Sequence, residues 1–323
     1  MAVKQVEIRS AGKTFAVPAV EIEGRTVIAR GGRIKTASIM DDAIAPGELV
    51  KDPDRFVAEL KRSGLKADVL TFFQRPPDVE PRFKYHYELD NYAAIDCSDY
   101  AAWWEKLPQE ARKNTRRATK RGVTVKTVAY DDALAQGIHK LCNESPVRQG
   151  RPFWHYGKDF ETIKRDHGTY LDRSEFIGAY FEDELIGFIK YVYVDKIAFL
   201  LHILAFNAHY DKRPLNALLT KAVEICSQKG LKYFVHDKYY YGNKKDSTLL
   251  EYKRRNGYEP INFPRYYIPL TLKGKIYVGS RLYRGPLGLI PAPALSVLLK
   301  VREKFHSKKL KAAPAGGEGA GED

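Results

Sequence analysis

Cysteine is scarce in this chain. The 323 residues include three cysteines, Cys97, Cys142 and Cys226, which stand far apart. This spacing provides neither a disulfide framework nor a Cys-x-x-Cys pair for zinc, and it excludes the class of small disulfide-stabilised secreted proteins. We expect reduced thiols and a reducing compartment, and Cys226, within a predicted helix, gives no sign of a nucleophile role.

Long apolar segments are absent as well. The longest run without a charged residue, residues 285–299, contains Pro286, Pro291 and Pro293. It is shorter than the roughly 20 residues that span a bilayer. The first residues, MAVKQVEIRSAG, lack the apolar stretch of a secretory signal behind their positive charge. The sequence therefore predicts a cytoplasmic protein without a transmembrane helix.

Metal-binding patterns are missing too. His202 and His209 lie seven residues apart, and neither has a carboxylate partner at the spacing of a zinc site. Isolated histidines of this kind are mostly structural. We expect no metal.

Positive charge, in contrast, is abundant. Lys and Arg number 54 against 40 Asp and Glu, which leaves a formal net charge of +14 and a pI of about 9.4. This balance favours polyanionic partners such as RNA, acidic lipid or phosphorylated small molecules, without selecting among them. The hydrophobic content of 44% excludes disorder as the general state, and the length suggests about two domains.

Hydrophobic periodicity places a first domain at residues 1–98. Short strand-like runs alternate there with turn signals, one amphipathic helix is predicted at residues 53–63, and a proline-rich connector occupies residues 75–81. The predicted strands are residues 3–8, 15–22, 26–29, 68–73 and 85–95. We place the domain boundary near Ser98.

A second domain, residues 99–272, alternates helices with strands. The predicted helices are residues 99–107, 108–121, 130–145, 158–167, 214–229 and 247–256, and the predicted strands are residues 123–128, 175–181, 184–194, 197–206, 233–237 and 266–272. This order predicts an α/β protein of the mixed α+β kind, with helices on a mixed sheet. Beyond it, residues 273–311 form a basic amphipathic tail, and the low-complexity residues 312–323 are expected to be disordered.

The order of elements in the second domain resembles the core of GNAT acyltransferases, and three segments are more specific. Residues 107–125 (LPQEARKNTRRATKRGVTV) resemble a basic helix of the Fem peptidyltransferases that ends in Gly-Val before a strand. Residues 184–237 resemble the central strands and donor-side helix of that family. Residues 251–260 (EYKRRNGYEP) resemble its Phe-Lys-x-x-Phe-Gly-x-x-Pro element, with Tyr252 and Asn256 in place of the two phenylalanines.

The resemblance implies an acyl-CoA N-acyltransferase-like mixed sheet flanked by helices, in two tandem GNAT-like units. It also implies transfer of an acyl or aminoacyl group from a thioester or a tRNA ester to an amine or hydroxyl. The donor is expected where two central strands splay apart. Such a reaction needs orientation, a way to remove the nucleophile's proton, and a hydrogen-bond donor for the carbonyl oxygen.

Three residues are candidates for the chemistry. Lys253 matches the lysine of the family's Phe-Lys element, where a fixed ammonium stabilises an oxyanion or a donor phosphate. Asp237 lies near the family's acidic position and is a candidate general base, and Tyr258 is a candidate proton donor to the leaving group. Each has an ordinary alternative: Lys253 in a basic helix end, Asp237 as a structural strand-end residue, and Tyr258 as one of 21 tyrosines.

Donor binding in GNAT enzymes uses backbone N–H groups of a central strand and of a glycine-rich loop that opens a helix. The resemblance assigns these positions to Ile203, Ala205, Asn207, Lys212, Arg213 and Asn216. The loop, residues 210–217, contains no glycine, so the two cations would carry more of any phosphate contact. Acyl-CoA and aminoacyl-tRNA both stay open as the donor, and an ordinary helix start is the alternative.

A basic stripe lies on the predicted helix of residues 108–121. Its cations fall at i and i+4 in two adjacent rows, and its candidate acceptor- or phosphate-binding residues are Arg112, Lys113, Arg116 and Arg117. The stripe suits RNA backbone, a nucleotide-linked acceptor or an anionic membrane. A solvated basic face is the alternative.

Two hypotheses about function remain. The first is a cytoplasmic Fem-like acyl or aminoacyl transferase that modifies an amine or hydroxyl of an envelope or polysaccharide precursor, with tRNA as a candidate partner. The second is a catalytically inactive protein of the same fold that binds RNA or an anionic membrane surface. The basic tail predicts peripheral membrane contact, with a solubilising role as the alternative. A run of tyrosines, Tyr239 to Tyr241, is a weaker candidate for stacking bases or sugars.

Overall fold

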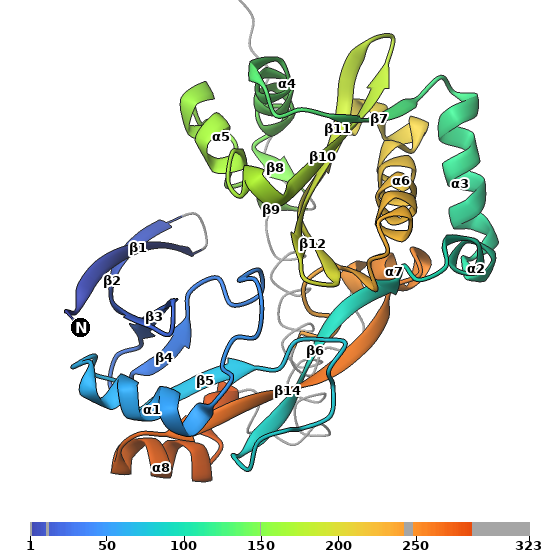
Figure 1. Ribbon diagram of the computed structural model, residues 1–323. Helices are drawn as coiled ribbons and strands as arrows, with labels where there is room; N and C mark the ends of the chain where they lie inside the picture. The colour runs from blue at the N-terminus through green and yellow to red at the C-terminus, as the bar shows by residue number, and fades with distance from the viewer. Residues whose placement is uncertain (1, 11–12, 149, 242–247, 286–323) are drawn as a thin grey trace, which may run out of the picture.

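A large mixed sheet organises the molecule. The computed structural model describes residues 2–10, 13–148, 150–241 and 248–285. In these residues 12 strands form one sheet flanked by helices, and a separate hairpin pairs β8 (Val147–Arg148) with β9 (Arg151–Pro152) (Figure 1). The predicted mixed α/β class, a mixed sheet flanked by helices, is confirmed.

The N-terminal part of the chain contributes six strands of the sheet and one helix. These are β1 (Lys4–Ser10), β2 (Lys13–Ile22), β3 (Arg25–Arg30), β4 (Thr36–Ile39), α1 (Pro53–Arg62), β5 (Val69–Phe73) and β6 (Tyr87–Asp96). The helix α1 begins where predicted, because the side chain of Asp52 accepts a hydrogen bond from the backbone of Arg55 and Pro53 occupies the first turn. Phe56 and Leu60 on one face of α1 are buried.

The C-terminal part adds the remaining strands of the sheet and most of the helices. They are α2 (Tyr100–Lys106), α3 (Gln109–Lys120), β7 (Thr124–Val128), α4 (Asp132–Cys142), α5 (Phe160–His167), η1 (Leu171–Arg173), β10 (Ser174–Phe181), β11 (Glu184–Val194), β12 (Ile197–Ala205), η2 (Asn207–Lys212), α6 (Pro214–Gln228), β13 (Tyr233–Val235), α7 (Thr248–Arg255), β14 (Glu259–Pro269), α8 (Leu272–Gly279) and η3 (Leu282–Arg284). The helices and strands predicted for this part are confirmed apart from the last strand. The helix α8 that follows this strand was not predicted.

The sheet contains the same arrangement twice. The strands β2, β3 and β4 form an antiparallel meander, α1 follows, and β5 returns parallel to β4. The strands β10, β11 and β12 form a second meander, α6 follows, and β13 returns parallel to β12. The two tandem units predicted from the resemblance are therefore present.

Each unit lends its last strand to the other. The sheet order is β1-β2-β3-β4-β5-β14-β6-β13-β12-β11-β10-β7. The strand β6 follows β5 in the chain but pairs with β13, and β14 follows β13 but pairs with β5. The two exchanged strands also pair with each other over Glu259–Tyr266 and Tyr87–Ala94. A continuous sheet thus joins strands from both sides of Ser98, and the predicted domain division at that residue stays a prediction.

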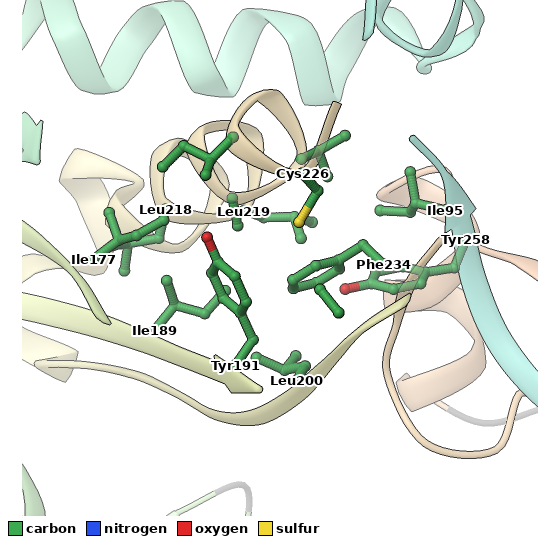
Figure 2. Close-up of a cluster of buried hydrophobic side chains, with 14 of the residues drawn as sticks. Ile95, Ile177, Ile189, Tyr191, Leu200, Leu218, Leu219, Cys226, Phe234 and Tyr258 are labelled. Atoms are coloured by element: carbon green, nitrogen blue, oxygen red, sulfur yellow. The ribbon is translucent and has the colours of Figure 1, made fainter. Parts of the chain in front are cut away.

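Alternating side chains place a core on each face of the shared strands. On β6, Ala93 and Ile95 pack in the cluster beneath α6, whereas Tyr92 and Ala94 pack with α1 and the first unit. This alternation follows from the two-residue repeat of a strand. Figure 2 shows the cluster beneath α6, where Tyr191 and Phe234 rise from their strands toward the helix.

The last strand of the sheet begins earlier than the sequence predicted. We expected it at residues 266–272, but β14 spans Glu259–Pro269 and Leu272 instead opens α8. The early part of β14 contains Pro260 and Pro264, which do not favour a strand because proline cannot donate a hydrogen bond within a sheet. The strand pairs with β6 over Glu259–Tyr266 and with β5 only over Arg265–Pro269, so Pro260 and Pro264 lie where one edge of β14 has no strand partner.

The predicted basic tail is only partly described. Its start forms α8, which packs on β14. The side chain of Thr271 caps this helix by accepting a hydrogen bond from the backbone N–H of Gly274. Residues 286–323, which hold most of the predicted amphipathic tail and the predicted disordered segment, lie outside the described residues. None of the helices in the described ranges is both long and apolar enough to cross a bilayer.

The continuous sheet makes a prediction about unfolding. Phe73 of β5 is buried against Phe263 of β14, with ring centroids 5.2 Å apart. We expect Phe73→Ala to cost about 3 to 5 kcal/mol of unfolding free energy. All the tryptophans stand at residues 103, 104 and 154 in the other unit, so their fluorescence should report the same lowered midpoint in a urea titration.

The matched control is Phe15→Ala on β2, because that ring is 48% exposed. It should change the unfolding free energy by less than about 0.5 kcal/mol. An unchanged tryptophan midpoint in Phe73→Ala would mean that the two units unfold independently.

Candidate functional site

A cleft lies where three helices of the second unit meet. It has a volume of about 1080 Å³ and opens between α3, the start of α6 and α7. Its lining residues are Pro108, Glu110, Ala111, Asn114, Tyr210, Arg213, Pro214, Leu215, Asn216, Glu251, Tyr252, Arg254, Arg255 and Asn256. The cleft therefore combines guanidinium groups and amides with aromatic and proline rings.

The central strands separate beside this region. The parallel pairing of β12 with β13 covers Ile197–Phe199 and Tyr233–Val235. Beyond Phe199, β12 continues to Ala205 while it stays paired with β11 on its other edge. The described structure thus contains the separated central strands that the resemblance implied for a donor site.

Arg213 replaces a loop glycine at the start of α6. Its backbone adopts a left-handed conformation with φ of 59°, which costs a residue other than glycine roughly 1 to 2 kcal/mol. Its side chain makes no capping hydrogen bond, and Pro214 takes the first position of the helix. The cleft thereby meets the positive end of a 15-residue helix together with a guanidinium, which favours an anion.

An amide pair connects α6 to α7 at the cleft. The Asn216 side chain donates a 3.3 Å hydrogen bond to the Asn256 side-chain oxygen, and the Asn256 side-chain nitrogen donates to the Tyr252 carbonyl at 2.7 Å. The pair holds the two helices in register. It also leaves polar amide atoms next to the positive end of α6.

The other predicted donor residues lie outside the cleft lining. The Lys212 ammonium sits 4.6 Å from the centroid of the Phe181 ring, and the Ala205 carbonyl accepts a hydrogen bond from Arg148 at 2.9 Å. Ile203 pairs with its neighbour on β11, and Asn207 opens η2 in an exposed position. Of the six predicted donor residues, the cleft brings together Arg213 and Asn216.

The basic stripe of α3 lies beside the cleft rather than in it. The α3 residues that line the cleft are Glu110, Ala111 and Asn114. Arg117 is the predicted cation nearest to them, because it donates a 2.9 Å hydrogen bond to the Asn114 side chain. Lys113 is exposed.

Two more cations of the stripe have partners within the protein. Arg112 pairs with Glu105 at 2.7 Å, and the Arg116 guanidinium lies 5.7 Å from the centroid of a Trp104 ring. Their charge is partly engaged locally, which weakens the case for one uninterrupted phosphate-binding row. The assignment of these residues to an acceptor stays a prediction.

Lys253 is buried on the side of α7 away from the cleft. Its side chain has no exposed surface, its ammonium donates to the Lys238 carbonyl, and it lies 5.0 Å from the centroid of the Tyr241 ring. Burial lowers the pKa of Lys253 to about 8, while the charge of Asp237 opposes the shift. The exposed basic helix end weighed as an alternative describes Arg254 and Arg255 instead.

Asp237 lies close to Lys253, whose pKa its charge affects. Its carboxylate accepts a 2.7 Å hydrogen bond from the Tyr241 hydroxyl, so one tyrosine contacts both candidates. The backbone of Asp237 is left-handed, with φ of 47°, and its carbonyl accepts from Ala93 of the exchanged strand β6. Strain of this kind is costly and concentrates at functional sites.

Tyr258, the third catalytic candidate, belongs to the core beneath α6. Its side chain is 2% exposed, and its hydroxyl makes no hydrogen bond to another described residue. Burial raises the pKa of Tyr258 well above that of a free tyrosine. Figure 2 shows its ring beside Phe234 and Ile95. Its role as a proton donor stays a prediction.

The sequence assigned no site role to several residues of the region. Asn114 resembles any polar residue on a surface helix, so it carried no signal. Tyr210 stood in the predicted donor loop, Tyr241 in the tyrosine run and Asn256 in the motif of residues 251–260, where each could have been chosen. Only folding places Asn114, Tyr210 and Asn256 along one cleft.

Comparison with known proteins identifies solved structures that have a similar fold. No family model and no curated protein sequence matches this chain. Among solved structures, FemX is similar with 12% identity over 85% of this chain and 89% of its own, at a TM-score of 0.54. The chain shares the fold of FemX.

A second similar structure is the C-terminal domain of a putative lysylphosphatidylglycerol synthetase from Agrobacterium fabrum. It is 14% identical over 81% of this chain and 87% of its own, at a TM-score of 0.50. A conserved protein from Bacteroides thetaiotaomicron is 10% identical over 79% of this chain and 86% of its own, also at 0.50. These likenesses confirm the fold that the sequence resemblance implied.

The buried ammonium of Lys253 gives a pH prediction. Its folded pKa of about 8 lies below the ordinary value of 10.5, so between these pH values the unfolded chain holds a proton that the folded chain has lost. Stability contributed by Lys253 therefore rises with pH in this window. Relative to Lys253→Met, the wild-type unfolding free energy should increase by roughly 2 kcal/mol from pH 8 to pH 10.

Urea unfolding of both proteins at each pH measures this difference. Lys66→Met serves as the control because Lys66 is exposed, and its difference from wild type should not depend on pH. A constant difference for Lys253→Met would show that the ammonium is well solvated.

Proposed function

We propose that this protein transfers an activated acyl or aminoacyl group from a donor ester to an amine or hydroxyl. The observation that carries the proposal is the cleft, in which the positive end of α6, Arg213 and the Asn216–Asn256 pair face one space. The fold supports it, since the chain shares it with FemX and with the lysylphosphatidylglycerol synthetase domain. The acceptor we propose is an envelope or polysaccharide precursor.

The cleft binds the phosphate-bearing end of the donor in this proposal. The positive dipole end at the first turn of α6 attracts an anion, and the Arg213 guanidinium supplies charge-assisted hydrogen bonds. Tyr210 and Tyr252 offer aromatic faces to a base or a pantetheine chain. Arg254 and Arg255 are held by Glu251 at 3.1 and 2.6 Å, so Arg213 is the cation of the cleft with the freest side chain.

Asp237 and Lys253 perform the chemistry in this proposal. The exposed carboxylate of Asp237 takes the proton from the attacking amine or hydroxyl as the new bond to the carbonyl carbon forms. Protonated Asp237 then returns this proton to the leaving thiolate or ribose oxygen as the bond of that group to the carbon breaks. Lys253 lies behind Asp237, where its charge and its hydrogen bond to the Lys238 carbonyl hold the segment that carries the base.

The cleft is connected to this pair through one contact. The ring of Tyr252, which lines the cleft, lies 6.3 Å from the ring of His236, and His236 directly precedes Asp237. A donor bound in the cleft would therefore be separated from the proposed base by the Tyr252 and His236 side chains.

Donor binding is the first test. Isothermal titration with coenzyme A, acetyl-CoA and a long-chain acyl-CoA, and filter binding with aminoacyl-tRNA, separate the two donor classes. Arg213→Gln should weaken binding of the true donor about 10- to 100-fold, as expected for a lost charged hydrogen bond. The matched control Arg62→Gln, on an exposed face of α1, should bind like wild type.

Turnover is the second test. Asp237→Asn should slow transfer to an amine acceptor by about a hundredfold or more while donor affinity stays unchanged. Failure of both donor classes to bind would reject the proposal. Steeply salt-dependent RNA binding without transfer would instead favour the inactive RNA-binding alternative.

A further inference from the structure

Three side chains that commonly bind metal ions meet in the interior of the second unit. Cys142 ends α4, His155 lies between β9 and α5, and His167 ends α5. Each offers one ligand atom, and these atoms all lie within 4.8 Å of one another. All three residues are buried, with exposed fractions of 0%, 5% and 1%. None of them belongs to the cleft or to the Asp237–Lys253 pair.

A third imidazole stands beside these residues. The ring of His202, from β12, lies 4.5 Å from the ring of His167 and 5.9 Å from that of His155, between centroids. The three converging residues thus offer two nitrogens and one sulfur, and a ring nitrogen of His202 would be the fourth ligand. Such a set suits the tetrahedral geometry and N/S preference of zinc.

The hydrogen bonds of the ring nitrogens fit metal ligands. The Nδ1 atom of His167 lies 3.0 Å from the Ile163 carbonyl, which fixes the proton there and leaves Nε2 as a lone pair. The Nδ1 atom of His155 is buried and makes no hydrogen bond to any described residue. A polar atom left unpaired in a protein interior costs about 1 to 3 kcal/mol. A bound cation would remove that cost.

The charges around the cluster permit a cation. Positive groups around the cluster include Lys190, whose ammonium donates to the carbonyls of His167 and Thr169. Lys158 pairs with Asp166 at 2.9 Å, and Arg148 pairs with Glu144 at 2.7 Å. A thiolate at Cys142 would offset the charge of Lys190.

We propose that Cys142, His155, His167 and His202 bind one divalent zinc-type ion in a closed structural site. On binding, the S–H bond of Cys142 breaks, a sulfur–metal bond forms, and the proton leaves to solvent, with no change of oxidation state. The ion would tie α4, α5 and β12 together, and β12 is the strand whose far end leads to the cleft.

The sequence predicted no metal because the cysteines form no Cys-x-x-Cys pair and because His202 and His209 have no carboxylate partner at the spacing of a zinc site. The ligands proposed here stand at positions 142, 155, 167 and 202. Those intervals match no compact zinc motif.

Cobalt is the probe for the test, because it substitutes for zinc and reports its ligands spectroscopically. The full chain, stripped with a chelator, is titrated with Co²⁺. We expect about one ion per chain, strong visible bands of tetrahedral cobalt, and a near-ultraviolet thiolate-to-cobalt band. Cys142→Ser should lose the thiolate band, and the matched control Cys226→Ser, another fully buried cysteine, should keep it.

Three outcomes would overturn the proposal. These are wild-type protein that binds no stoichiometric cobalt, weak bands typical of six-coordinate cobalt, and a thiolate band that persists in Cys142→Ser. If Cys142→Ser does not fold, His155→Gln provides the second variant, and it should weaken cobalt binding at least tenfold. Elemental analysis of the protein as purified adds a readout independent of transferase activity.

Discussion

The antiparallel pairing of β6 with β14 holds the two units in one sheet. Each strand comes from one unit and completes the other, so neither unit has a closed sheet of its own without the exchange. Both faces of β6 are buried, since Ala93 packs beneath α6 and Ala94 packs with the first unit. A strand with two buried faces cannot slip in register without exposing apolar side chains on both.

The same exchange positions the proposed site. The Ala93 carbonyl of β6 accepts from the backbone of His236, and its N–H donates to the carbonyl of Asp237, both at 2.8 Å. The parallel pairing of β13 with β12 has ended by this point. The first unit therefore supplies the backbone that fixes the candidate base of the second unit in its left-handed conformation. Through this contact the first unit contributes to the proposed site of the second unit.

Two lysines in the interior give the second unit its electrostatic character. Lys190 and Lys253 each have a pKa lowered to about 8 by burial, and each ammonium donates to backbone carbonyls. Carbonyls replace part of the lost hydration, and no salt bridge to either ammonium is found in the described part of the chain, which leaves the cations only partly compensated. Lys253 borders Asp237, and Lys190 borders the histidine cluster. Each buried ammonium thus lies beside one of the two proposed sites, the catalytic pair or the metal cluster.

The local sequence predicted most elements because their signals lie within a few residues. Asp52 and Pro53 mark the start of α1, and alternating apolar residues mark β10 to β12. The prediction was wrong at β14, because prolines are unfavourable inside a sheet. They are accommodated here because one edge of β14 has no strand partner at Pro260 and Pro264. For the site, the motif of residues 251–260 pointed to Lys253, while the burial of Tyr258 and the partners of the α3 cations were invisible in the sequence.

The sequence by itself determined the class of fold, the positions of the helices and most strands, and the excess of basic charge. These depend on periodicity, capping and composition, which act locally along the chain. Only the tertiary structure decided that β6 and β14 exchange units, that Asn114 and Asn256 share a cleft, and that Cys142 meets three histidines. Those outcomes depend on contacts between residues far apart in the chain, and sheet pairing and core packing select them together.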